Sequence, residues 1–188
     1  MDKKAIEITL RPFDRSDFKR LISWVLTPES HGQWCASSFD YPLDEDQLQR
    51  YLDSASRPNT RVIFTALLPS GEPVGHVEVS IIWPYLSSRL SRVLVAPDRR
   101  RLGIGGAMVG SAVSFSFETH HVDRIDLGVD ADNLAAINCY RRQHFEHVGT
   151  WPQAMAAGPK IIDVYWMTLS RAKWRVDSKP VVDAGPSV

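Results

Sequence analysis

Glycines and arginines gather in one short stretch, residues 99–110, which reads RRRLGIGGAMVG. Glycine has no Cβ atom, so Gly103, Gly105 and Gly106 leave their backbone amides open to a ligand. A glycine-bearing loop that opens a helix also directs several N–H groups and the positive end of the helix dipole toward one place, where a phosphate fits. Arg99–Arg101 add fixed positive charge. The stretch therefore predicts a local anion site, most often a phosphate site.

Two general phosphate-binding patterns fit this stretch poorly. The dinucleotide fingerprint GxGxxG has its third glycine where this chain has Met108, and residues 96–102 separate the preceding strand from the first glycine. A P-loop needs a lysine directly before Ser111, and Gly110 stands there instead. A nucleotide-binding protein that uses Gly105–Gly110 stays open as an alternative. A glycine-rich turn with solvated arginines is the other alternative.

Patterns of apolar residues place the stretch after a strand and before a helix. Alternating residues predict strands, and apolar residues at i, i+3, i+4 and i+7 predict helices. Strands are expected at residues 6–11, where Pro12 ends the strand, and at residues 61–68, 74–83, 90–95, 124–129, 148–151 and 163–169. Helices are expected at residues 18–25, 44–55, 104–115 and 134–143. Pro28 is expected to stop the first helix, and His31–Pro42 is interpreted as an aromatic surface loop. This order of elements predicts an α/β protein built around one mixed sheet.

The composition indicates one globular domain. The chain has 188 residues, 44% of them hydrophobic, and 22 Lys and Arg balance 22 Asp and Glu. A formal net charge of zero favours neither a nucleic-acid partner nor a membrane partner. The first residues lack the apolar core of a secretory signal, and no later stretch has the roughly 20 apolar residues of a membrane span, so we expect a cytoplasmic protein. We expect a domain over residues 1–174 and a disordered tail over residues 175–188.

Two separated motifs resemble the signature of the GNAT-type N-acetyltransferase superfamily. Residues 95–105, VAPDRRRLGIG, are similar to the family's (Q/R)xxGx(G/A) loop, which wraps the pyrophosphate of acetyl-CoA. Residues 133–145, NLAAINCYRRQHF, resemble the family's NxxAxxLYxxxGF helix, with Cys139 and His144 where the family has leucine and glycine. The resemblance covers roughly residues 6–170, the compact part of the chain. It implies a GNAT-like fold, with a mostly antiparallel mixed sheet of about seven strands flanked by about four helices.

The resemblance also implies a cofactor site, which takes acetyl-CoA and needs no metal. The residues that would bind acetyl-CoA are Val93, Leu94, Val95, Arg100, Arg101, Leu102, Gly103, Ile104, Gly105, Gly106, Asn133, Ala136 and Tyr140. Tyr140 is also the expected general acid, because a phenol with a pKa near 10 can protonate a thiolate leaving group at neutral pH. The alternative is that Tyr140 only packs in the core.

The general base and the acceptor site follow less directly. Residues 90–95 contain no carboxylate, so Glu78 on the neighbouring expected strand is the candidate base, directly or through water, and a solvated strand face is the alternative. Trp34, Phe39 and Tyr41 are the candidate acceptor pocket, although they could instead close one end of the core. The expected reaction is direct transfer of an acetyl group from acetyl-CoA to a primary amine of a small molecule, polyamine, peptide or protein. We expect a monomer or a homodimer, and a non-catalytic acyl-CoA-binding sensor stays open as an alternative.

Overall fold

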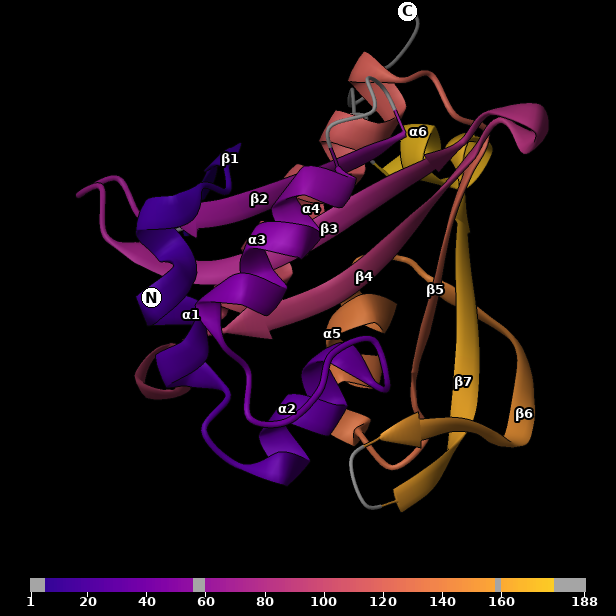
Figure 1. Ribbon diagram of the computed structural model, residues 1–188. Coiled ribbons are helices and arrows are strands. Elements are labelled where there is room, and N and C mark those ends of the chain that lie inside the picture. The colour runs from indigo at the N-terminus through magenta and orange to yellow at the C-terminus, as the bar shows by residue number, and fades with distance from the viewer. Residues whose placement is uncertain (1–5, 56–59, 158–159, 178–188) are drawn as a thin grey trace, which may run out of the picture.

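A seven-stranded mixed sheet forms the centre of the protein. The computed structural model describes residues 6–55, 60–157 and 160–177. Across the sheet the strands follow the order β1-β2-β3-β4-β5-β7-β6 (Figure 1). Neighbouring strands pair antiparallel, except that β4 and β5 pair parallel. The strands are β1 (Thr9–Pro12), β2 (Arg61–Leu67), β3 (Pro73–Ile82), β4 (Ser87–Val95), β5 (Arg124–Asp130), β6 (Glu146–Ala157) and β7 (Lys160–Ser170). The expectation of a mostly antiparallel mixed sheet is confirmed.

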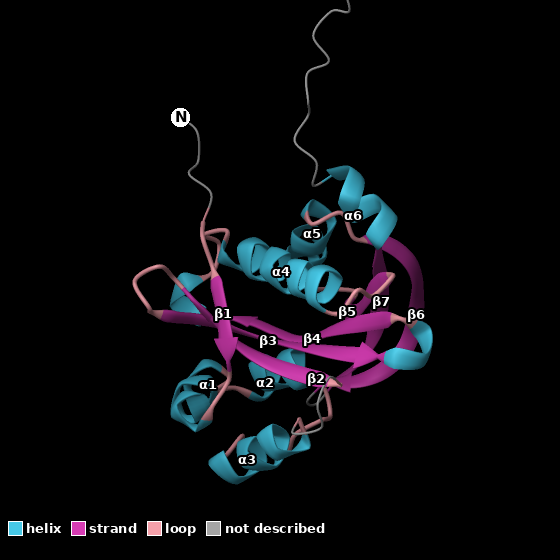
Figure 2. Ribbon diagram, turned by 90° about the horizontal axis from the view of Figure 1, so that it is seen from above, coloured by secondary structure: helices cyan, strands magenta, loops and turns pink. Residues whose placement is uncertain are grey.

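Helices cover both faces of this sheet (Figure 2). One face carries α1 (Phe18–Trp24), α2 (Pro28–Cys35) and α3 (Glu45–Ser54). The other face carries α4 (Ile104–Ser114), α5 (Leu134–Arg142) and α6 (Arg171–Asp177). The sheet therefore separates two helical layers, each with its own core. Among the described residues, no helix combines the length and the apolar character that crossing a membrane requires.

The described residues form six α-helices rather than about four, and α2 is one of the two that the sequence did not predict. The interpretation of His31–Pro42 as a loop is wrong for His31–Cys35, which complete α2. Pro28 begins this helix instead of stopping the previous one, because a first-turn residue needs no N–H for an intrahelical hydrogen bond. Thr27 and Ser30 form a reciprocal capping box at the same end. Proline thus starts a helix where it was expected to end one.

Several expected boundaries also differ from the structure. Helix α6 includes residues 175–177, the first three of the segment expected to be disordered, and residues 178–188 lie outside the described residues. Strand β1 (Thr9–Pro12) ends at Pro12 as expected but begins at Thr9 rather than at residue 6. Strand β6 has twelve residues and extends beyond the expected strand at residues 148–151 at both ends.

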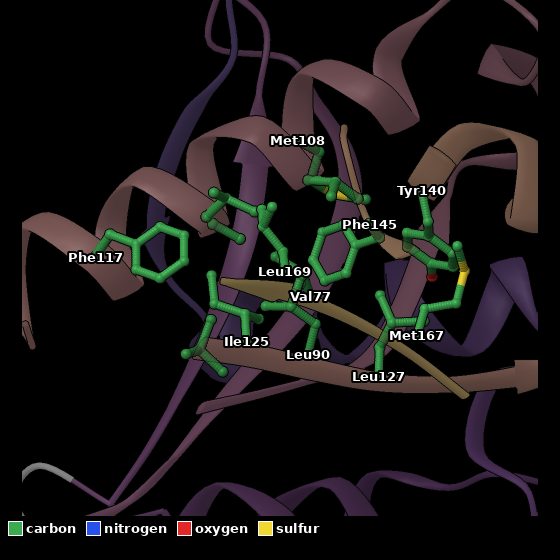
Figure 3. Close-up of a cluster of buried hydrophobic side chains, with 14 of the residues drawn as sticks. Val77, Leu90, Met108, Phe117, Ile125, Leu127, Tyr140, Phe145, Met167 and Leu169 are labelled. Carbon is green, nitrogen blue, oxygen red and sulfur yellow. The ribbon is translucent and has the colours of Figure 1, made fainter. Parts of the chain in front are cut away.

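Apolar side chains fill a core on each side of the sheet. The core between the sheet and α4 contains Met108, Phe117, Leu127 and Met167 among its buried members (Figure 3). The core between the sheet and α1 to α3 is built from these side chains and others: Phe13, Phe18, Leu21, Trp34, Leu48 and Tyr51. Both helical layers thereby pack against the same sheet. Residues from either layer can therefore lie near the end of β4.

Strands β4 and β5 run together for only a short distance. Ser87–Arg89 of β4 pair with Arg124–Asp126 of β5, and the pairing ends there. Both strands continue, β4 to Val95 and β5 to Asp130, and they diverge along that length (Figure 1). The backbone of the second half of β4 therefore has no β5 partner, which leaves hydrogen-bonding groups on that edge.

A β-bulge in β4 lies three residues beyond Arg89, the last residue of β4 that pairs with β5. His76 of β3 pairs with Leu94 and Glu78 pairs with Ser91, so two residues of β4 stand opposite one residue of β3. Arg92, one of these two, has a φ of 52°, which is uncommon for a residue other than glycine. A bulge of this kind bends the strand and increases its twist. The bend therefore lies in the part of β4 that has no β5 partner.

Gly75 is the position where α4 packs most tightly on β3. A Cβ atom at Gly75 would lie 2.6 Å from Met108 Sδ and 3.0 Å from the carbonyl oxygen of Leu94. Because Met108 is fully buried, we expect Gly75→Ala to lower the free energy of unfolding by about 1–3 kcal/mol, measured by urea denaturation. Gly149→Ala is the matched control, since no atom lies within 4 Å of a Cβ there. Equal effects of the two substitutions would contradict this account of the packing.

His76 is a buried histidine in the core beneath α1 to α3. Only 1% of its surface is exposed, and its ring meets those of Phe13 and Trp34 edge-on, with centroid distances of 5.0 and 5.6 Å. Removal of the imidazole from water lowers its pKa to about 3, because burial disfavours the charged form. The folded protein therefore holds His76 neutral over the whole range in which a solvated histidine gains a proton.

We expect the free energy of unfolding to decrease as the pH falls from about 6.5 toward 3, because the unfolded chain binds a proton at His76 that the folded protein excludes. One such group contributes a slope of roughly 1 kcal/mol per pH unit. Urea denaturation at a series of pH values measures this slope, and His76→Phe should reduce it. Val148→Ala, at a side chain that is 63% exposed and carries no titratable group, should leave the slope unchanged. The proposed cause fails if His76→Phe and the unaltered protein show the same slope.

Candidate active site

A cavity of about 520 Å³ lies where β4 and β5 diverge, and we call it the β4–β5 cavity. Its walls come from the end of β4, the loop and first turn that open α4, one face of α5, and α2. The residues that line it are Ser30, Gln33, Trp34, Val93, Leu94, Val95, Arg99, Arg100, Arg101, Gly103, Gly105, Gly106, Asn133, Ala135, Ala136, Asn138, Cys139, Tyr140 and Arg142. Both motifs that the sequence singled out thus meet in one cavity.

The first turn of α4 presents bare backbone to this cavity. Helix α4 begins at Ile104, after Gly103, whose φ of 88° suits a residue without a Cβ. Gly105 lies close to two neighbours, because a Cβ there would be 3.4 Å from Val95 Cγ2 and 3.7 Å from Cys139 Sγ. Amides in the first turn of a helix have no intrahelical acceptor, and the helix dipole adds positive potential at the same end. This turn can therefore bind an anion.

Four arginines line the same cavity, namely Arg99, Arg100, Arg101 and Arg142, and the described lining contains no acidic residue. Arg99 is ion-paired with Glu72, with 2.8 Å between Nη2 and Oε1. Arg100 donates a hydrogen bond from Nε to the carbonyl oxygen of Val95 at 3.3 Å. The excess of positive charge favours a ligand with several negative charges.

The structure brings together all the expected acetyl-CoA-binding residues except Leu102 and Ile104 in the lining of this cavity. Leu102 is 54% exposed to solvent, and the Ile104 side chain is buried. Asn133 caps α5, since its Oδ1 accepts a hydrogen bond from the amide of Ala136 at 3.1 Å. The amide nitrogen of the Asn133 side chain remains a donor for a ligand.

Tyr140 both packs in the core and lines the cavity. Its side chain belongs to the core on the α4 side and is 8% exposed, with its ring centroid 6.0 Å from that of Phe145 (Figure 3). Burial raises the pKa of the Tyr140 hydroxyl above its ordinary value, because it disfavours the phenolate. The hydroxyl therefore keeps its proton at neutral pH and can donate a hydrogen bond to a group that gains negative charge.

Glu78 lies on the other side of the sheet and is not part of the wall of the β4–β5 cavity. It is 2% exposed, and the Tyr51 hydroxyl donates a hydrogen bond to its Oε2 at 2.8 Å. Ser80 donates to Oε1 at 3.0 Å. Ion pairs with Arg92 and with Arg61, the latter at 3.5 Å, complete its surroundings. Both carboxylate oxygens of Glu78 are thus engaged by neighbouring side chains.

The three aromatic residues expected at the acceptor site occupy different places. Trp34 lines the β4–β5 cavity and donates a hydrogen bond from Nε1 to the carbonyl oxygen of Arg92 at 3.2 Å. Phe39 stacks on Trp34, with 5.2 Å between the ring centroids. Tyr41 lies apart from the described cavity walls and donates to the carbonyl oxygen of Leu26 at 2.8 Å. The structure joins Trp34 and Phe39 and leaves Tyr41 outside the group.

Several lining residues were not predicted from the sequence. Helix α5 contributes four of them, namely Ala135, Asn138, Cys139 and Arg142. Counted from Ala135, they stand at positions i, i+3, i+4 and i+7. That spacing defines one face of a helix, so it could have identified them. The lining residues Ser30 and Gln33 of α2 could not have been found while their segment was interpreted as a loop.

Comparison with known proteins gives a family and a fold. Residues 19–145 match the model of the acetyltransferase (GNAT) family. The L-amino acid N-acetyltransferase AaaT of Escherichia coli (strain K12) is 24% identical over 163 residues, which cover 86% of this chain and 96% of that protein. The aminoglycoside N(6')-acetyltransferase type 1 of Klebsiella pneumoniae is 25% identical over 155 residues, 76% of each chain.

Among solved structures, the spermidine N-acetyltransferase from Vibrio cholerae in complex with CoA and spermine superposes with a TM-score of 0.78. It is 19% identical to this chain, and the match covers 90% of this chain and 98% of that one. The fold is therefore shared. The segment that matches the family model spans more than half of the chain and includes the first turn of α4 and all of α5. The chain belongs to the GNAT family and is an acetyl-CoA-dependent N-acetyltransferase.

Proposed function

We propose that the β4–β5 cavity binds acetyl-CoA and that the acetyl group passes directly to the primary amine of a small molecule in a ternary complex. The observation that carries this proposal is the meeting of three features in one cavity. These are the bare first turn of α4, the unpaired end of β4 and the side chain of Tyr140. Acetyl-CoA supplies an activated acetyl thioester when it is bound.

The first turn of α4 is the proposed pyrophosphate site. Gly103, Gly105 and Gly106 leave room for phosphate oxygens to approach backbone amides, and Arg100 and Arg101 add charge beside them. Leu102 and Ile104 are absent from the cavity lining, so the binding role expected for them from the sequence would be limited to their backbone. This arrangement explains why an overall neutral chain can hold a polyanionic ligand.

The end of β4 is the proposed site for the extended arm of the same ligand. Val93–Val95 have no β5 partner on the side that faces the cavity. Their backbone groups can hydrogen-bond an amide-containing chain in the way that an added strand would. Asn133 and Ala136 lie across the cavity from β4 on α5. The two elements would orient the thioester toward the Trp34 end of the cavity.

Tyr140 is the proposed general acid. Its hydroxyl stays protonated because burial raises its pKa. Cleavage of the thioester would leave a thiolate, and proton transfer from Tyr140 would neutralise that leaving group. Cys139 beside it does not suit a covalent intermediate, because burial raises the pKa of its thiol and the thiolate is the nucleophilic form. Direct transfer in a ternary complex follows from this pair of residues.

The acceptor amine must lose a proton before it attacks. A free alkylamine has a pKa near 10.4, so most of it is charged at neutral pH. The proposal that Glu78 is the base stays a prediction, and any transfer to its hydrogen-bonded carboxylate would pass through water. Binding of the small neutral fraction of the amine is the alternative route.

The relatives favour an amine acceptor over the other two functions considered from the sequence. Two of them are named for acetylation of L-amino acids and of aminoglycosides, and the fold neighbour for acetylation of spermidine. Neither the sensor module nor the nucleotide-binding protein gains support from these comparisons. The division into a domain over residues 1–174 and a tail, the cytoplasmic location, and the monomeric or homodimeric state remain predictions of the sequence.

An acetyl-transfer assay tests the proposed function. The purified protein is incubated with acetyl-CoA and, one at a time, L-amino acids, polyamines and an aminoglycoside, and release of the free thiol is followed. We expect thiol release that depends on one class of amine, and an N-acetylated product in the mass spectrum. Tight binding of acetyl-CoA without transfer to any amine would favour the sensor instead.

We expect Tyr140→Phe to lower kcat by roughly 10²-fold, because the proton for the leaving thiolate would then come from solvent. The KM for acetyl-CoA should change little, since the aromatic ring that lines the cavity is retained. Tyr85→Phe is the matched control, because Tyr85 is 69% exposed and does not line the cavity. If Tyr140→Phe keeps the full kcat, Tyr140 has only its packing role.

A further inference from the structure

A second cavity of about 350 Å³ lies on the opposite side of the bulge, between α3 and the strands β2 to β4. We call it the arginine cavity. Its lining is almost entirely polar and consists of Ser37, Ser38, Phe39, Asp40, Gln47, Arg50, Tyr51, Ser54, Arg61 and Arg92. Three arginines thus face one carboxylate in its wall. A small cavity with this composition is suited to an anionic group.

Arg92 is held rigidly in the wall of this cavity. Its guanidinium lies over the rings of Phe39 and Tyr51, at 5.4 and 5.0 Å from their centroids. The Nη1 of Arg92 forms an ion pair with Glu78. The Nε of Arg92 is buried and has no hydrogen-bond partner among the described residues. A guanidinium fixed in this way loses little conformational freedom when it binds a further planar anion. Arg92 is therefore preorganised for binding.

The positive charge of the cavity exceeds what its acidic neighbours balance. Glu78 engages both Arg92 and Arg61, and Arg61 also donates from Nη1 to Ser54 Oγ at 2.9 Å. Arg50 forms no ion pair with any residue in the described part of the chain. Asp40, the one acidic residue in the lining, leaves a net positive wall.

The arginine cavity and the β4–β5 cavity share a wall. Trp34 lines the β4–β5 cavity, and the stacked ring of Phe39 lines the arginine cavity. Along β4, Val93 lines one cavity and Arg92, the residue before it, lines the other. The Trp34 side chain is tied to this point by its hydrogen bond to the carbonyl oxygen of Arg92. The two cavities are therefore adjacent, and the Trp34–Phe39 pair and the backbone at Arg92–Val93 stand between them here.

We propose that the arginine cavity binds a carboxylate of the acceptor, so that the acceptor is an amine that also carries a carboxylate. The inference rests on the proposed function, which places the reacting amine in the neighbouring β4–β5 cavity. A carboxylate accepts two parallel hydrogen bonds from one guanidinium, and the exposed Arg50 offers such a pair of donors, while Arg92 adds its positive charge beside it. Polyamines and aminoglycosides carry several positive charges and would be repelled by the same wall.

Paired acceptors test this inference. Each L-amino acid is compared with its own carboxamide, beside spermidine and an aminoglycoside, in the thiol-release assay. We expect kcat/KM for the best amino acid to exceed that of its carboxamide by at least about tenfold, because only the carboxylate makes charge-assisted hydrogen bonds. The carboxamide has the less basic amine and therefore the larger fraction of neutral, reactive amine. A preference for the amino acid thus cannot come from its supply of neutral amine.

Arg50→Gln identifies the cavity responsible. Arg50 is exposed at the surface of α3, so the variant should fold, and it should reduce kcat/KM for the amino acid by about tenfold while the carboxamide is unaffected. Arg15→Gln is the matched control, since Arg15 is an exposed arginine outside both cavities. Arg92→Lys, which keeps the charge but not the planar fork, should also weaken the preference.

A binding measurement separates the two proposals. N-acetyl-L-amino acids and their carboxamides are added with CoA, and the thermal shift is compared in the unaltered protein and Arg50→Gln. A shift specific to the carboxylate, lost in Arg50→Gln, supports the inference even if no amine is acetylated, in which case the proposed function fails alone. Transfer to spermidine or to carboxamides without a carboxylate preference, or a preference that Arg50→Gln retains, overturns the inference and leaves the proposed function standing.

Discussion

The bulge at Arg92 is the feature on which the arrangement of the site depends. An extra residue in β4 shifts its register against β3, and it lies in the part of the strand that continues without β5 after three paired residues. The gap between the two strands would be closed by hydrogen bonds in a regular sheet. Because it is open, the first turn of α4 and one face of α5 can meet the end of β4 around a cavity. A non-glycine residue at positive φ is conformationally costly, and such costs are concentrated at functional sites.

Contacts on the other face hold that bulge in place. The Arg92 carbonyl accepts from Trp34, and its side chain is fixed by Glu78 and by the ring of Tyr51. A buried carboxylate is unfavourable unless it is paired and hydrogen-bonded, and Glu78 meets both conditions through its neighbours. The layer of α1 to α3 therefore does more than bury apolar surface. Its polar groups also contact the bulge of β4, which adjoins the β4–β5 cavity.

The sequence predicted the parts of the site that local chemistry determines. Glycines at a helix start and flanking arginines indicate an anion site whatever surrounds them, and the strand and helix periods placed α4 and α5 correctly within a few residues. The bulge had no such signal, because nothing about an arginine between Ser91 and Val93 indicates a positive φ. Helix α2 was missed because Pro28 has opposite meanings at the two ends of a helix. The surroundings of Glu78 depend on contacts across β2, β3, β4 and α3, which no local pattern contains.

The two cavities draw on different stretches of the chain. The walls of the β4–β5 cavity come mainly from residues 93–106 and 133–142, whereas the arginine cavity takes most of its lining from residues 37–54. Residues 37–54 contribute no strand to the sheet. If the arginine cavity binds the acceptor as proposed, substitutions at its exposed positions in this segment would alter which amine is accepted without changing the residues that line the β4–β5 cavity. On this proposal, the residues that hold the acetyl donor and most of the residues that select the acceptor lie in different segments of the chain, so each set can change without the other.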